Sequence, residues 1–405
     1  MNNCIGSGII AVPLIGLNTF MNQKKLNIGL LLPQSNMYPL VGNDLSTGLR
    51  LGVNNQEHME LFMEDIALGV SQELVIEKAR KLILQYNTDI VICMVGQHLA
   101  EPLAELFNQS KKILFILTLG ENLHLYPTFS PYVYYISFEL WRSMWAIGAH
   151  IGEQPAKNVA VLTSLYDSGY LMPFAFNKGL EHKGGKLVYT HLVAPQTNVE
   201  TDKHLFLKNF IASGADAIMI NCSSKNAIDL WRNYIEFTEL ENIPLYGSPF
   251  SVADYLLTEH TTSVNNTYSG TAWSTALELP QNKHFVNLYT EETDNIPSPF
   301  ALLGYEAGIF IKTIIENSLG EKLTPKLIAE KMQTAQIISP RGKLIINKQS
   351  NYISSTHFLT RVSEMDGQFV QEIIKELNPV EKEQEMEEEL KSSIYSGWKN
   401  PYMCI

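Results

Sequence analysis

Hydroxyl and aromatic side chains occur together in a short loop near the start of the chain, at residues 34–43. The loop contains Ser35 and Tyr38, follows an apolar run at 26–32, and precedes apolar residues at helical spacing over 45–53. This order predicts a buried strand, a loop and a helix, the opening unit of a parallel α/β sheet. In such sheets ligands bind beyond the carboxyl ends of the strands. We therefore expect this loop to line a ligand site.

Motifs for catalysis or metal binding are absent from the sequence. It has no GxSxG nucleophile elbow, no P-loop lysine and no HExxH pair. The four cysteines, at positions 4, 93, 222 and 404, show neither CxxC spacing nor a disulfide framework. We therefore predict a protein that is not an enzyme and that carries no cofactor and no metal.

The length and the net charge of the chain limit the class of protein it can be. A chain of 405 residues is too long for one ordinary core and fits two domains. The net charge of -12 argues against a nucleic-acid partner, which needs clustered Lys and Arg. No run of 18 apolar residues occurs, so no transmembrane segment is expected. For residues 1–24 an export signal and an ordinary disordered amino terminus stay open as alternatives.

Strand and helix patterns alternate in two series. The first continues to residue 119, an aromatic and proline-containing segment at 121–138 interrupts it, and a second series runs from 140 to 247. This alternation predicts an α/β fold of two doubly wound lobes with helix-covered parallel sheets. The later elements are too few for a third core. We expect them to complete the two lobes, so that the chain crosses between the lobes three times.

These patterns give a provisional division of the chain. Lobe 1 is expected to comprise residues 25–137 and 248–336, and lobe 2 residues 138–247 and 337–378. Residues 379–405 form an acidic spacer and an aromatic tail. A charge run such as EKEQEMEEE is typically a solvated helix or a disordered spacer. The tail after it either docks on a lobe or offers a peptide to a partner.

Several segments in this order resemble a known family. They include IGLLLPQSNMYPLVGNDLSTGLRLG, KARKLILQYNTDIVICMVG, NVAVLTSLYDSGY, ADAIMINCSSKNAIDLWR, FALLGYEAGIFIKTIIEN and SPRGKLIIN. Together they are similar to the type I periplasmic binding fold, in particular the branched-chain amino-acid-binding family of ABC-transporter receptors. The resemblance implies non-enzymatic capture of a small polar or amphipathic ligand in a cleft between two lobes that close by hinge bending. It also implies a role in ABC-type uptake or sensing, a location in the periplasm or cell envelope, and an ABC permease or another envelope protein as partner.

The resemblance also implies a set of ligand contacts. Carried over by position, they fall on Ser35, Tyr38, Gly96, Gln97, Thr118, Gly120, Glu121, Tyr166, Tyr170, Asn221, Ser223 and Ser248. The chain departs from amino-acid binders of this family at 97–98, 119–121 and 248–249, where the expected hydroxyl and acidic residues are replaced. The resemblance therefore does not imply an α-amino acid as ligand. We hypothesise that Glu121 meets a cationic group.

Each functional interpretation has a structural alternative. Thr118 and Ser223 fit ligand contact and helix capping equally well. Tyr166 and Tyr170 could stack on a ligand or pack against the protein, whereas Trp141 and Trp145, four residues apart on a helix, are expected in the core. A second hypothesis for the whole chain is an envelope or assembly protein that uses this fold and the tail to bind another protein, without a small ligand.

Overall fold

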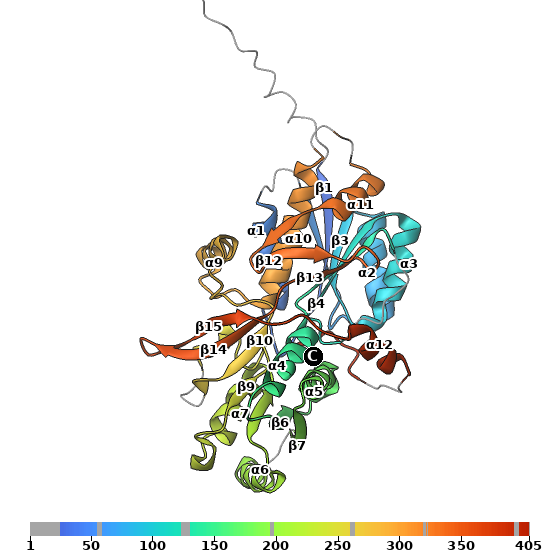
Figure 1. Cartoon of the computed structure of the whole chain (residues 1–405). Coiled ribbons are helices and arrows are strands. Elements are labelled where there is room, and N and C mark those ends of the chain that lie inside the picture. Colours follow the sequence, from blue (N-terminus) through green and yellow to red (C-terminus); the bar gives the residue numbers. More distant parts are fainter. Residues whose placement is uncertain are drawn as a thin grey trace, which may run out of the picture.

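The computed structural model describes residues 25–54, 59–122, 130–194, 198–259, 264–318, 321, 323–392 and 397–404. These residues form two α/β lobes, one above the other in Figure 1. The chain passes from lobe 1 to lobe 2 after residue 137, returns after 271, and passes again to lobe 2 after 354. The prediction of two doubly wound lobes with a three-segment hinge is confirmed.

Lobe 1 is built on a mixed sheet with eight strands in the described ranges. Across the sheet these are β11 (Ile337–Ser339), β12 (Gly342–Ile346), β13 (Tyr352–Ser354), β5 (Val133–Ser137), β4 (Ile113–Thr118), β3 (Ile90–Met94), β1 (Leu26–Leu32) and β2 (Met59–Asp65). The strands from β13 to β2 pair in parallel, and β11 and β12 form an antiparallel edge. The parallel strands therefore end at one edge, where a ligand site is expected.

Helices cover both faces of this sheet because successive strand residues point to opposite sides. Ile92 of β3 belongs to the same apolar cluster as residues of α1 (Val41–Val53), α9 (Pro280–Thr293), α10 (Pro299–Glu316) and α11 (Pro325–Thr334). Its neighbour Cys93 packs with the short helix η3 (Gln97–Leu99), α2 (Gln72–Leu84) and α3 (Ala100–Ser110). The apolar strands are buried on both faces as a result.

Lobe 2 has the same plan. Across its sheet the described strands are β15 (Gln368–Glu376), β14 (Phe358–Met365), β10 (Tyr268–Thr271), β9 (Leu245–Gly247), β8 (Ala217–Asn221), β6 (Asn158–Ser164) and β7 (Lys186–Val193). One face packs against α4 (Leu140–Gly152) and α5 (Met172–His182), and the other against α6 (Val199–Ser213) and α7 (Ser224–Tyr234). Shorter helices are η4 (Asp167–Gly169), η5 (Thr238–Leu240) and α8 (Asp254–Leu257).

The sheets divide the chain differently from the expected boundaries. Residues 248–336 were expected in lobe 1, but β10 pairs with β9 in the sheet of lobe 2. Residues 337–378 were expected in lobe 2, but β11, β12 and β13 lie in the sheet of lobe 1. The aromatic segment was expected only as a crossing, yet β5 within it is a central strand of lobe 1. Short strands take their sheet from tertiary pairing partners, which the local pattern does not specify.

A buried carboxylate joins two of the hinge segments. Glu139 lies fully buried just after β5, and its Oε2 accepts a hydrogen bond of 2.9 Å from the backbone N–H of Ser355, which follows β13. Its Oε1 lies 3.0 Å from Nε of Arg142 on α4. Burial raises the pKa of Glu139, and the charges of Arg142 and Arg341 act in the opposite direction. The two crossings are thus held together by one side chain.

The acidic run forms a docked helix, α12 (Glu383–Ser392), rather than a fully solvated spacer. Met386 is buried in a cluster with Trp141 and Trp145, which confirms the prediction that both tryptophans are core residues. Ion pairs at the helix start and near its end, Arg142–Glu383 at 2.6 Å and Lys178–Glu389 at 2.9 Å, add to this packing. The helix is therefore fixed to lobe 2. Over the described ranges, no helix combines the length and apolar character that crossing a membrane requires.

Lobe 1 contains a buried ion pair whose removal we expect to be costly. Nε and Nη2 of Arg341 each donate at 2.7 Å to the carboxylate of Glu306, and both side chains are fully buried. Arg341→Met leaves the carboxylate uncompensated and should lower the free energy of unfolding by about 3–5 kcal/mol. Lys312→Met removes an exposed ion pair with Glu316 and should lower the free energy of unfolding by less than about 1 kcal/mol. Urea unfolding measures both, and similar losses for the two variants would contradict this role.

His357, at the last crossing, should make the stability dependent on pH. Burial and the charges of Arg142 and Arg341 lower its pKa to about 3. The unfolded chain, with a histidine pKa of about 6.5, binds more protons, so this contribution is lost as the pH falls below 6.5. Between pH 6.5 and 5 the wild type should lose about 1.5 kcal/mol relative to His357→Gln. Denaturant unfolding at each pH checks this, and parallel curves for the two proteins would refute it.

Candidate functional site

The carboxyl ends of the parallel strands of both lobes face a common space, and residues 397–404 of the same chain occupy it. We call these residues the C-terminal segment. Lobe 1 contributes Ser35 after β1 and Glu121 after β4, and lobe 2 contributes Tyr166 after β6 and Phe250 after β9. Figure 1 shows the C-terminus between the two lobes. Tyr402, Met403 and Cys404 belong to the apolar cluster that runs through both lobes.

Three aromatic rings of lobe 2 surround the ring of Tyr402, which is fully buried. Tyr166 stacks on it with ring centroids 5.8 Å apart and planes at 14°. Tyr170 and Phe250 meet it edge-on, at 5.0 Å and 5.4 Å. We call these three residues the aromatic pocket. Stacked and edge-to-face contacts of this kind stabilise a planar ring beyond the burial of its area.

A buried carboxylate lies at the end of the aromatic pocket. The hydroxyl of Tyr402 donates a hydrogen bond to Oδ1 of Asp167, and Ser164 donates to Oδ2. Burial raises the pKa of Asp167, whereas the hydrogen bonds from Ser164 and Tyr402 lower it. Burial also raises the pKa of Tyr402, so its hydroxyl stays a donor. The site can therefore recognise a flat ring that carries a hydroxyl group.

The backbone of the C-terminal segment is held from both lobes. Ser35 of lobe 1 donates to the carbonyl of Met403, whose N–H donates to the Tyr166 hydroxyl of lobe 2 at 2.9 Å. Trp398 forms two more hydrogen bonds with lobe 2. Its indole Nε1 donates to the carbonyl of Tyr166 at 2.7 Å, and its backbone N–H donates to the carbonyl of Gly169 at 3.1 Å. The segment therefore bridges the two walls of the cleft.

Glu121 is buried beneath the C-terminal segment. Thr118 donates to its Oε2 at 3.1 Å, and the N–H of Tyr402 lies 3.4 Å from its Oε1. Burial raises the pKa of Glu121, and these hydrogen bonds lower it. The groups around the carboxylate here are thus neutral donors. The hypothesis that Glu121 meets a cationic ligand group stays a prediction.

Of the twelve predicted contacts, five lie directly against the C-terminal segment. Four of them form the hydrogen bonds of the cleft: Ser35, Glu121, Tyr166 and Tyr170. At Gly96 the carbonyl of Lys399 occupies the place of a side chain. Ser223 lies beside Asp167; it occupies the N-cap position of α7 without forming a side-chain cap, so capping does not explain it.

The other predicted contacts have partners within the lobes. The hydroxyl of Tyr38 donates to Asp44, while its ring meets Tyr255 across the cleft at 5.4 Å. Thr118 binds Glu121, and its oxygen accepts from the N–H of Gly120. Asn221 donates to the hydroxyl of Thr163, and Ser248 donates to the carbonyl of Cys222. Gln97 lies half-buried on η3. Their role as ligand contacts stays a prediction.

Sequence reasoning missed Asp167 and Phe250. Asp167 lies between two predicted contacts, so a carboxylate flanked by two tyrosines after a strand was an available signal. Phe250 follows β9 by three residues, and nothing in its local sequence marks it. The described residues contain no group of three or more His, Cys, Asp or Glu arranged to hold an ion.

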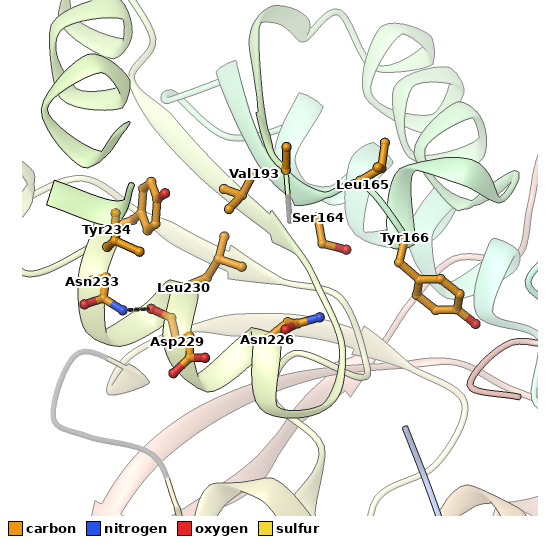
Figure 2. A pocket seen from close by; sticks show the side chains of 11 residues that line it. Ser164, Leu165, Tyr166, Val193, Asn226, Asp229, Leu230, Asn233 and Tyr234 are labelled. Atoms are coloured by element: carbon orange, nitrogen blue, oxygen red, sulfur yellow. Dashed lines mark hydrogen bonds between the residues drawn. The ribbon is translucent and has the colours of Figure 1, made fainter. Parts of the chain in front are cut away.

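A second cavity, of about 330 Å³, lies in lobe 2 behind Tyr166. Its lining comes from the end of β6 and the following loop, from the end of β7 and the residues after it, and from one side of α7: Ser164, Leu165, Tyr166, Val193, Ala194, Val199, Asn226, Asp229, Leu230, Asn233 and Tyr234. Figure 2 shows the ring of Tyr166 turned away from the other lining residues. This cavity shares a wall with the aromatic pocket but has lining from one lobe only.

A methyl group at position 96 should displace the C-terminal segment. A Cβ there would coincide with the carbonyl oxygen of Lys399, whereas at Gly42 a Cβ has 3.7 Å of space. We expect Gly96→Ala to speed amide hydrogen exchange of Tyr402 and Met403 at least tenfold, with the rest of the fold protected. Gly42→Ala is the matched control. Unchanged exchange of the C-terminal segment in Gly96→Ala would refute the observed placement.

Comparison with known proteins identifies the architecture. A family described as periplasmic binding protein matches residues 25–368. No curated protein sequence matches the chain. Among solved structures, an ABC transporter substrate-binding protein from Sphaerobacter thermophilus has a TM-score of 0.76 and 22% identity, over 88% of this chain and 98% of that one.

Two further structures come from Rhodopseudomonas palustris and hold aromatic acids. One is a solute-binding protein of an ABC transporter in complex with 3,4-dihydroxybenzoic acid, with a TM-score of 0.73 and 20% identity, over 89% of this chain and 99% of that one. The other, in complex with 4-hydroxybenzoate, has a TM-score of 0.70 and 20% identity, over 89% of this chain and 99% of that one. At these identities the likeness concerns the fold.

Proposed function

The chain belongs to the periplasmic binding protein family of solute-binding proteins, and we propose that the solute it captures is a small phenolic molecule, held between the two lobes. The observation that carries this proposal is the environment of Tyr402. Its phenol ring lies between three aromatic rings, and its hydroxyl donates to the buried carboxylate of Asp167. A free phenol of similar size offers the same ring and the same donor.

Other polar groups of the cleft complete this recognition. The hydroxyls of Ser35 and Tyr166 contact the backbone of Met403 and can serve a polar substituent of a solute. The two fold relatives from Rhodopseudomonas palustris hold hydroxylated benzoic acids, which supports an aromatic ligand class. One replacement argues against an α-amino acid as the solute: Ser248 takes the place of the expected acidic residue and donates to the carbonyl of Cys222.

The solute is passed to a partner rather than converted. The cleft groups form hydrogen bonds and aromatic contacts, and no nucleophile with an adjacent base stands out among the residues that contact the C-terminal segment. We propose an ABC permease, or another envelope protein, as the partner and the periplasm or cell envelope as the location. The family match supports these roles. The second hypothesis, a protein-binding role without a small ligand, has no such support.

Calorimetric titration tests the ligand class. Full-length Tyr402→Ala, which vacates the aromatic pocket, should bind 4-hydroxybenzoate about tenfold more tightly than benzoate, because only the phenol can donate to Asp167. Asp167→Asn in the same background should reduce this preference. Asp229→Asn, a carboxylate of the second cavity, is the matched control and should retain it.

The proposed function fails on two outcomes. In one, neither wild type nor Tyr402→Ala is stabilised by any member of a panel of phenols, aromatic acids and amino acids in a thermal-shift assay, since a bound ligand must raise stability by mass action. In the other, benzoate binds Tyr402→Ala as tightly as 4-hydroxybenzoate, which would exclude hydroxyl recognition by Asp167.

A further inference from the structure

We infer that the C-terminal segment is a tethered peptide ligand of this cleft, which competes with the solute for the same pocket. The peptide-binding part stands on the contacts of the segment itself, and the competition rests on the proposed function. The inference assigns a second ligand class to the site, a peptide that presents a tyrosine and a tryptophan four residues apart.

The contacts of the segment are those of a bound ligand rather than of a loosely docked tail. Tyr402, Met403 and Cys404 are each fully buried. The hydroxyl, N–H and carbonyl groups that they bury find partners on both lobes, at Asp167, Tyr166 and Ser35.

The walls of the cleft leave room for a peptide at two glycines. At Gly169 the indole of Trp398 lies where a side chain would begin, and at Gly96 the carbonyl of Lys399 does. Any larger residue at either position would exclude the segment. The two glycines therefore accommodate the main chain and the indole of the segment, and the aromatic pocket accommodates its phenol.

The tether keeps this ligand close to its site. Helix α12 is fixed to lobe 2 by Met386 and by the ion pairs at Glu383 and Glu389. Only residues 393–396 connect it to the C-terminal segment. A connection of this length gives an effective concentration on the order of millimolar. A solute must therefore compete with a ligand that is always present and that lies across both lobes.

Direct binding of the peptide tests the inference. The probe is a fluorescently labelled synthetic peptide of residues 397–404, GWKNPYMC, titrated by anisotropy into full-length protein with Trp398→Ala and Tyr402→Ala. This double variant should bind the peptide at least tenfold more tightly than wild type, whose own segment occupies the cleft. A peptide with Tyr402→Phe should bind about tenfold more weakly, through the lost hydrogen bond to Asp167.

Controls separate peptide binding from misfolding and from solute binding. Gly169→Val in the double variant should abolish peptide binding while circular dichroism and thermal unfolding stay those of its parent. Unlabelled 4-hydroxybenzoate should displace the labelled peptide. If the peptide binds and no solute does, the proposed function fails and the peptide site stands.

Two outcomes overturn the inference. The first is that wild type and the double variant bind the peptide with equal affinity, or that the double variant binds the Tyr402→Phe peptide as tightly as the unmodified peptide. The second is simultaneous binding of 4-hydroxybenzoate and peptide, with the same solute affinity in wild type and in the double variant. In that case solute capture stands and competition by the C-terminal segment does not.

Discussion

The hydrogen bond from Tyr402 to the buried carboxylate of Asp167 is the contact around which the cleft is arranged. A carboxylate removed from water is costly unless donors satisfy its oxygens. Ser164 supplies one donor from the same loop, and the phenol supplies another from the far end of the chain. The aromatic pocket holds the phenol ring in place beside this carboxylate. The need of Asp167 for a second donor therefore fixes the position of the whole C-terminal segment.

The segment that carries Tyr402 also links the two lobes. The C-terminal segment takes hydrogen bonds from Ser35 of lobe 1 and gives them to Tyr166 of lobe 2. The first and the last hinge crossings are joined by Glu139, which accepts a hydrogen bond from Ser355 and pairs with Arg142. A two-lobe protein changes the distance between its lobes by bending at such crossings. In this molecule the chain's own C-terminal segment lies between the lobes and is hydrogen-bonded to both of them.

The C-terminal segment and a small solute differ in what they lose on binding. The segment must order its backbone, at a cost of about 1–2 kcal/mol per residue. A small phenolic solute has no chain entropy to lose, although the ring contacts and the hydrogen bond to Asp167 offered to both are the same.

The sequence by itself determined the two-lobe α/β plan, because period-2 and helical patterns are local properties. It also predicted Ser35, Glu121, Tyr166 and Tyr170 as contacts at strand ends. These four lie against the C-terminal segment, and their role toward a solute stays a prediction. Tertiary structure alone decided the pairing of β10 with lobe 2 and of β11–β13 with lobe 1, since a short strand is assigned by its partner across the sheet. It alone decided, too, that Tyr402 meets Asp167, 235 residues away in sequence. Such a contact depends on two lobes, a docked α12 and a cleft of the right width, and no local pattern encodes that combination.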